Sequence, residues 1–345
     1  MTSTIYYSTS APLSASVQSD ATGDEEMAQH HHRQQQHRSS QRGICHDEGG
    51  PLAVEDEEDK RSDDPVAARC NSEYDCSEVS AAVAAMRDAL RDLPMTEKDA
   101  YLEAKNECPD VVKAETPYAD FVKHDGLNAK AAALRLCRYW KVRRQAFGDV
   151  AAFLPMSLHG AMRESQDLLL DCNAMILPND DDGRGVLFID GSMPFTQDEC
   201  AKLLLFFTHR LKQQESVVRN GWALLLNVEG CDENDEIDRS RLETIQHICS
   251  RTLTIRNHGV HLFLGDKAAA GSVLPQALQD SPSPSSPSFL RIVFHRKHPG
   301  HGYNKDSVLQ SHGLNITNLS TVLGGEYTSD QFLEWLPPPG WGEKR

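Results

Sequence analysis

The feature that most constrains the fold is a change of hydrophobic period along the chain. Residues 129–148 repeat apolar side chains at helical spacing, with Leu134, Cys137 and Trp140 on one face. From about residue 185 onward, the apolar residues gather instead in short runs that are separated by helical stretches. This order predicts an α/β fold in which a helical lobe precedes a sheet.

The expected helical lobe extends from Ser77 to Phe147. Its last helix begins after Asn128, whose side chain is suited to an N-cap, and Gly148 occupies the position of a C-cap. The basic residues of this helix are expected to form its solvated side. They are Lys130, Arg135, Arg138, Lys141, Arg143 and Arg144.

Five short apolar segments are the candidate strands. Runs such as ALLLNV are apolar at nearly every position, which is typical of strands covered on both faces in parallel or mixed sheets. The segments between them have helical spacing, so we expect a mixed sheet backed by helices. The candidate strands are residues 172–177, 185–190, 222–228, 260–264 and 290–295, and the intervening helices are residues 197–218 and 238–255.

The N-terminal residues 1–75 have the composition of a disordered tail. They are rich in Ser, Gln and His, and their six Lys and Arg against fifteen Asp and Glu carry −9 of the formal net charge of −16. Their histidines lack the fixed spacing of a zinc site, so we expect adventitious metal affinity at most and no cofactor. The remaining chain has no clustered basic face, which argues against nucleic acid as a partner.

Targeting signals and cysteines bear on the location of the protein. No apolar run reaches the roughly 18 to 20 residues of a transmembrane segment, and no secretory signal is visible. The nine cysteines have no regular spacing, which favours reduced thiols over a disulfide framework. We therefore expect a cytoplasmic protein.

Motifs for catalysis and for ion binding are weak. Residues 179–183, NDDDG, lack ligands at the outer positions of a calcium loop and predict a turn. No phosphate loop, dinucleotide fingerprint or GxSxG motif occurs. Cys249 and His247 resemble a nucleophile and a base, but the sequence shows no third residue to orient them. We therefore expect a protein that is not an enzyme.

Several blocks of the chain, taken in order, resemble the CRAL-TRIO lipid-binding family. The likeness covers about residues 80–335, and it depends on the order and spacing of the blocks rather than on any single one. The blocks are FVKHDGLNAKAAALRLCRYWKVRRQAFG (121–148), LPNDDDGRGVLFID (177–190), ALLLNVEG (223–230), HGVHLFLG (258–265), and FLRIVFH (289–295) with VLQSHGLNITNLSTVLGGEY (308–327).

The resemblance implies both a domain order and a function. The expected order is the tail at 1–75, a helical lobe at 76–155, a CRAL-TRIO-like lipid-binding domain at 156–336 and a short tail at 337–345. In this family a mixed sheet and a gate helix enclose one hydrophobic ligand. The implied function is non-catalytic binding, and transfer between membranes, of a phospholipid, a phosphoinositide or an isoprenoid-type lipid.

Candidate site residues follow from the strands and from the family pattern. Arg291 is the candidate headgroup contact, whereas Arg256 stands where phosphoinositide-transferring members have a glutamate. The gate is expected to be short, because the prolines within residues 281–288 end any helix there. Its apolar candidates are Val273, Leu274 and Leu278. The pocket candidates are Leu187, Ile189, Leu224, Leu226, Leu262 and Leu264.

Two alternatives stay open at this point. Each pocket candidate is equally suited to an ordinary core position, because neighbouring residues of a strand point to opposite faces. The chain is also compatible with an interaction or regulatory module that keeps the fold without efficient lipid exchange. The basic residues near the last strand suggest peripheral contact with anionic membranes. They are Arg291, His295, Arg296, Lys297, His298 and His301.

Overall fold

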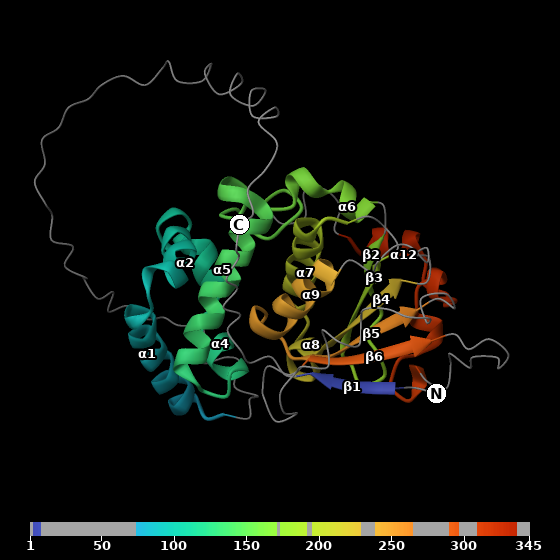
Figure 1. Cartoon of the computed structure of the whole chain (residues 1–345), viewed down its shortest axis with the longest axis horizontal. Helices are drawn as coiled ribbons and strands as arrows, with labels where there is room; N and C mark the ends of the chain where they lie inside the picture. Colours follow the sequence, from blue (N-terminus) through green and yellow to red (C-terminus); the bar gives the residue numbers. More distant parts are fainter. Residues whose placement is uncertain are drawn as a thin grey trace, which may run out of the picture. The chain divides into compact units, whose positions relative to one another are not determined.

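The protein is described by a computed structural model that covers residues 3–7, 74–170, 173–191, 195–228, 239–264, 290–296 and 309–336. All of these residues belong to one compact unit. They form a lobe of helices followed by a sheet with helices packed on it (Figure 1). The predicted α/β class, and the order of lobe and sheet, are confirmed.

The helical lobe is built around its longest helix, α5. Asn128 caps that helix as predicted, since its Oδ1 accepts a hydrogen bond from the backbone N–H of Ala131 at 3.1 Å. Gly148 does not end the helix: its φ of 75° produces a kink, and the helix resumes for one short turn. The helices are α1 (Cys76–Asp92), α2 (Met95–Glu107), α3 (Pro109–Glu115), α4 (Tyr118–His124) and α5 (Ala129–Ala151).

The six-stranded sheet has the order β1-β6-β5-β4-β3-β2. The strands β3 to β6 are parallel, and β2 and β1 close the two edges in antiparallel pairs. Mixed pairing was predicted and is confirmed. The strands are β1 (Ser3–Tyr7), β2 (Ala174–Leu177), β3 (Gly185–Asp190), β4 (Trp222–Val228), β5 (Asn257–Leu264) and β6 (Leu290–Arg296).

Strand β1 departs from the expectation of a tail without secondary structure. Residues 3–7 pair with β6 from Ser3 opposite Phe294 to Tyr7 opposite Leu290. Local composition did not signal this pairing, because the partner lies at the other end of the chain. Residues 8–73 lie outside the described part, so the prediction for them stays a prediction.

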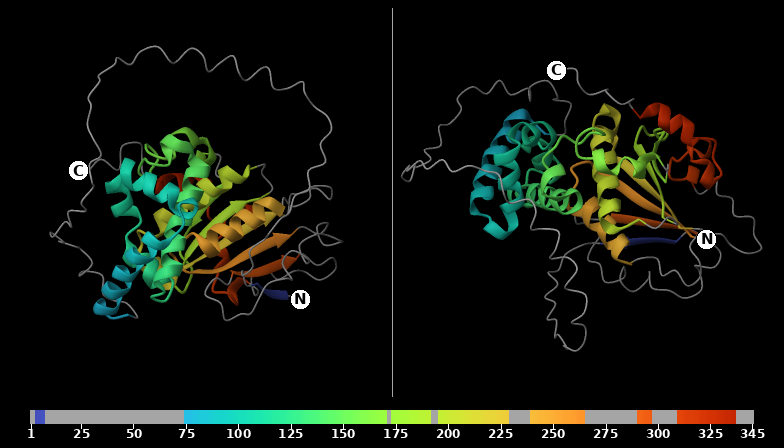
Figure 2. Two further views of the ribbon diagram at one scale, coloured as in Figure 1. Left: turned by 60° about the vertical axis from the view of Figure 1, so that its left-hand side comes forward. Right: turned by 90° about the horizontal axis from the view of Figure 1, so that it is seen from above.

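Helices connect the parallel strands and pack mainly on one face of the sheet (Figures 1 and 2). Helix α7 begins with a capping box, in which Thr196 accepts from the N–H of Glu199 and Glu199 accepts from the N–H of Thr196. The predicted helix 197–218 is divided into two. The helices are α6 (Asp167–Leu170), α7 (Gln197–Leu211), α8 (Glu215–Asn220), α9 (Arg239–Arg251) and α12 (Ser329–Trp335).

Two arginines of α5 are buried, which corrects their assignment to a solvated side. Arg135 forms a two-pronged ion pair with Asp125, with an Nη2 to Oδ1 distance of 2.8 Å and a Nε to Oδ2 distance of 2.9 Å. Arg143 is 0 % exposed; it pairs with Glu115 at 2.5 Å and stacks on the ring of Trp140. Ion-pair partners thus allow these positively charged side chains to enter the core.

The lobe is joined to the C-terminal end of α9 by polar contacts. Nη1 of Arg135 donates to the carbonyl oxygens of Ser250 at 2.9 Å and Leu253 at 3.1 Å. Nδ1 of His124 lies 3.0 Å from the carbonyl oxygen of Thr254 and, in the tautomer that carries a proton there, donates to it. Burial, and then the nearby Arg135, lower the pKa of His124 to about 4.

We expect this junction to weaken as the pH falls from about 6.5 to about 4. The unfolded chain takes up a proton at His124 near its ordinary pKa of 6.5, whereas the folded chain resists until about 4. Stability is therefore full above pH 6.5, and on the order of 3 kcal/mol is lost by pH 4. His124→Asn keeps a donor without titrating in this range. Urea unfolding at pH 7 and pH 4.5 should show a smaller pH effect for His124→Asn than for the parent chain. Equal effects would contradict the assignment.

Candidate functional site

Strand register places all six pocket candidates on the same face of the sheet. Leu187 stands beside Leu224, and Ile189, Leu226 and Leu262 form the next row. Leu264 is two residues after Leu262 in β5 and therefore belongs to the same face, although its side chain lies outside the described part. We call this side of the sheet the helix-backed face, because α7 and α9 pack on it.

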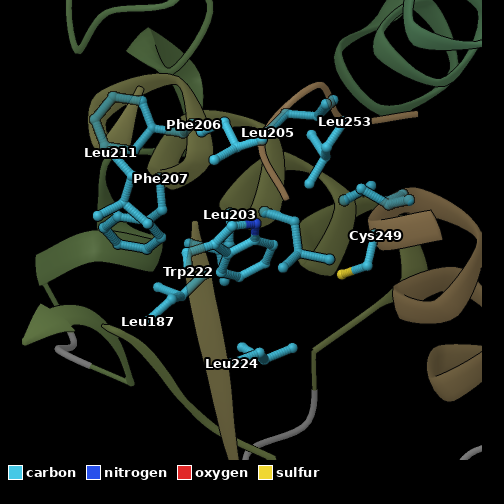
Figure 3. Packing of buried hydrophobic residues seen from close by; sticks show 14 of the residues in the cluster. Leu187, Leu203, Leu205, Phe206, Phe207, Leu211, Trp222, Leu224, Cys249 and Leu253 are labelled. Carbon is cyan, nitrogen blue, oxygen red and sulfur yellow. The ribbon is translucent and has the colours of Figure 1, made fainter. Parts of the chain in front are cut away.

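Packing against the helices gives these candidates the environment of a core. Figure 3 shows Leu187 and Leu224 pointing from the sheet toward Leu203 and Phe207 of α7. A Cβ added at Gly185, on the same face, would lie 2.7 Å from Cδ2 of Leu211. The five described candidates are at most 1 % exposed. They therefore occupy the interior between the sheet and the helices. This is the environment of an ordinary core position, which the sequence left open as the alternative to a pocket.

The other predicted site residues are not placed by the described structure. Val273, Leu274 and Leu278 lie outside the described residues. Arg291 belongs to β6, where its backbone pairs with Tyr6, but its side chain is outside the described part. Their roles stay predictions.

The opposite side of the sheet, which we call the second face, is largely apolar and carries polar residues at one end. Its residues alternate along each strand with those of the helix-backed face, and they lie side by side across the four parallel strands. Phe188, Leu225 and Phe263 are 0 % exposed, and His261 and His295 are nearly as buried. The members with described side chains are Met175 and Leu177 of β2, and Val186, Phe188, Asp190, Ala223, Leu225, Asn227, His261, Phe263, Val293 and His295 of the parallel strands.

Three histidines meet on the second face. Nδ1 of His261 lies 3.0 Å from Nε2 of His295, and the two rings are stacked with centroids 5.2 Å apart. The ring of His312 stands edge-on to His261 at 5.0 Å, and Phe263 stacks on His295 at 4.6 Å. When one of these two nitrogens carries a proton and the other does not, the protonated nitrogen donates and the other accepts. The pair is therefore a polar spot beside the apolar residues of this face.

His295 corrects one sequence-based expectation. It was assigned to an exposed cationic strip, but it is 2 % exposed and lies beneath aromatic neighbours. The signal that was overlooked is alternation: His261 and Phe263 have the same parity in β5, and His295 registers with Phe263. A histidine whose side chain points to the inner face of a strand is buried whether or not the following residues are basic.

Polar groups also meet at the carboxyl ends of the central strands. Nδ2 of Asn227 donates to Oδ1 of Asp190 at 3.2 Å, and the N–H of Gly191 donates to the carbonyl oxygen of Asn227 at 2.6 Å. Nη1 of Arg241 donates to the carbonyl oxygen of Gly191 at 3.2 Å. Open α/β sheets bind ligands at this edge of the strands. The row that runs from Asp190 to His295 is therefore the natural polar end of a site on the second face.

The start of the segment 309–336 lies on the second-face side of the sheet, whereas its helix α12 lies at the β2 edge, where Phe332 packs against Phe207 of α7 (Figure 2). His312 brings its start against His261, and its carbonyl oxygen accepts from Nη2 of Arg184 at 2.5 Å. The turn predicted at residues 179–183 is confirmed and holds that arginine, because Oδ2 of Asp180 accepts from its Nε at 2.6 Å. The NDDDG loop thus serves as an anchor for this segment, which covers the histidine pair.

Thiol chemistry receives no support from the environment of the cysteines. Cys108, Cys137, Cys200 and Cys249 are free, whereas Cys76 is disulfide-bonded, so the expectation of reduced thiols is wrong for Cys76. Burial, followed by the nearby Cys200, raises the pKa of the Cys249 thiol. The reactive thiolate form of Cys249 is therefore disfavoured at neutral pH.

Searches against known proteins add nothing to the resemblance of sequence blocks to the CRAL-TRIO family. No family model matches the chain, and no curated protein is significantly similar to it. Within the described residues, no helix has the length and apolar character needed to cross a bilayer. The same residues contain no group of three or more His, Cys, Asp or Glu side chains arranged to hold a metal ion.

Proposed function

We propose that this chain is a CRAL-TRIO-like protein that binds a hydrophobic ligand on the second face of its sheet. The ligand class is a phospholipid, a phosphoinositide or an isoprenoid-type lipid, held without chemistry and carried between membranes in the cytoplasm. The observation that carries the proposal is that both faces of the sheet are apolar, while among the described helices α7 and α9 back one of them. The order of helical lobe and mixed sheet also supports it.

The second face has the chemistry that a lipid requires. Burial of an acyl chain against Phe188, Leu225 and Val293 would gain about 0.8 kcal/mol for each methylene removed from water. The polar end of the ligand would lie near His261 and His295, where a hydrogen-bonding group finds partners. This arrangement matches the usual pattern of ligand sites, which are apolar with a few fixed polar groups.

Ligand entry requires the cover of the second face to move. Phe188 and Leu225 are fully buried, so no lipid contacts them until the residues above them are displaced. His312, which contacts the histidine pair, belongs to that cover. The same observation favours a second candidate function, in which the fold is a closed interaction or regulatory module without lipid exchange.

A matched pair of substitutions separates the two functions. Ala223 lies on the second face and Ala174 on the helix-backed face, and both are nearly fully buried. Ala223→Phe fills the site of a ligand, so we expect it to abolish co-purified lipid with little change in melting temperature. Ala174→Phe overpacks a core, so it should lower stability by about 1–3 kcal/mol and leave the lipid bound. Native mass spectrometry with lipid extraction, and thermal unfolding, give the two readouts.

Two outcomes would contradict lipid binding. One is a parent chain that is purified from cells without any lipid. The other is that both substitutions destabilise the fold equally, which would mean that the second face is close-packed core. Either result would favour the interaction module.

A further inference from the structure

We propose that the junction between α5 and α9 binds a phosphate group, held by Arg138, His247 and Arg251. This site is separate from the second face of the sheet, and it does not depend on lipid binding there. The three side chains come from helices of the lobe and of the sheet domain. A ligand at this junction would therefore bridge the two.

Contacts of Arg135 fix the geometry of the junction between α5 and α9. Its Nη1 donates to the carbonyl oxygen of Ser250 at 2.9 Å, which holds α5 directly against the last turn of α9. Arg138 follows Arg135 by about one helical turn, Arg251 follows Ser250 directly, and His247 precedes Arg251 by one turn. All three are half-buried. They therefore stand around one junction between the two helices.

The two arginines and His247 act on one another without a carboxylate between them. Burial, and then Arg138, lower the pKa of Arg251. Burial lowers the pKa of His247 first, followed by the charges of Arg251 and Arg138. Among the described residues, no acidic side chain forms an ion pair with any of the three.

Other arginines of the same region show how unusual this is. Arg135 is paired with Asp125, Arg143 with Glu115, and Arg144 with Glu103 and Asp99. Each of these cations has its counter-charge supplied by the fold. Arg138 and Arg251 have like charges as their neighbours instead. This arrangement weakens the fold unless an anion binds beside them.

A phosphate group supplies the negative charge that this junction lacks. Two guanidinium groups offer planar forks of N–H donors that match phosphate oxygens, and a protonated imidazole adds one more. A phosphate with two negative charges would offset both arginines at once. A single carboxylate would offset only one of them and would offer fewer acceptors.

Thermal unfolding of the full chain tests the site directly. Inorganic phosphate at ten times its dissociation constant should raise the melting temperature by about 3 °C, relative to sodium chloride of equal ionic strength. Arg251→Glu should raise the melting temperature without phosphate, because the new carboxylate faces Arg138, and it should abolish the phosphate response. Arg91→Ala, which removes an exposed arginine of α1, should respond to phosphate as the parent chain does.

Liposome binding then identifies the source of the phosphate group. Vesicles of phosphatidylcholine with a phosphoinositide monophosphate are compared with vesicles that carry phosphatidylserine at equal charge. Binding that prefers the phosphoinositide, is competed by glycerol 2-phosphate and is lost in Arg251→Glu would assign the site to a lipid headgroup. A thermal response to glycerol 2-phosphate without vesicle binding would assign it to a soluble phosphate ester.

One set of results would overturn the proposal. In the first part of this set, phosphate raises the melting temperature no more than chloride does, or raises it equally in Arg251→Glu. In the second part, Arg251→Glu leaves vesicle binding unchanged. Because Arg251→Glu is expected to stabilise the fold, loss of its phosphate response cannot be ascribed to unfolding if its melting temperature is at or above that of the parent chain.

Discussion

Leu262→Glu should leave no folded protein. The side chain of Leu262 is 1 % exposed on the helix-backed face, where it registers with Leu226. A glutamate there places an unpaired charge in an apolar interior and removes the packing of a leucine. The expected loss exceeds about 5 kcal/mol, which approaches the whole stability of an ordinary domain. Far-UV circular dichroism and the yield of soluble protein measure the outcome.

Val218→Glu is the matched control for this substitution. Val218 is 57 % exposed on α8, so the same change should alter the free energy of unfolding by less than about 0.5 kcal/mol. A folded Leu262→Glu protein that had lost only its co-purified lipid would contradict our account. It would place the ligand between the sheet and α7, as the leucine-rich strands first suggested.

Arg135→Met should destabilise the chain by about 4 kcal/mol. The substitution leaves the buried carboxylate of Asp125 without its partner, and the carbonyl oxygens of Ser250 and Leu253 without their donor. Removal of one member of a buried ion pair typically costs about 3–5 kcal/mol. Urea unfolding, followed by circular dichroism, measures the loss.

Two further variants show whether the buried charge is the cause. Arg91→Met breaks the exposed pair with Asp88 and should change the stability by less than about 1 kcal/mol. Arg135→Met combined with Asp125→Leu should recover about half of the loss, because no unpaired charge then remains. A double variant that is as unstable as the sum of both single variants would mean that the two residues act independently.

The strands were predictable because their local patterns are strong. Residues 185–190 and 222–228 were delimited correctly, since each is an almost wholly apolar run that follows a glycine or polar segment. Because nearly all residues of these strands are apolar, the sequence did not indicate which face of the sheet each residue occupies. In the run from Leu224 to Leu226, no polar residue marks a solvated side, so sequence gives no sign of where α7 packs.

Contacts between distant segments account for what the sequence did not predict. Arg135 and Arg138 are spaced like any basic flank of a helix, yet the first is buried by Asp125 and by carbonyl oxygens of α9. The histidine pair likewise requires β5 and β6 to lie side by side. The described structure brings together His261, His295 and His312, a group that sequence reasoning missed although alternation marked two of its members.

The pairing of β1 with β6 has a consequence for synthesis of the chain. Residues 3–7 leave the ribosome well before their partners at 290–296, which are the last strand of the sheet to be made. At translation rates of about 5–20 residues per second, this strand waits roughly 15 to 60 s for its partner. The edge of the sheet is therefore closed by a strand that was made before all the others, after the parallel strands have been made.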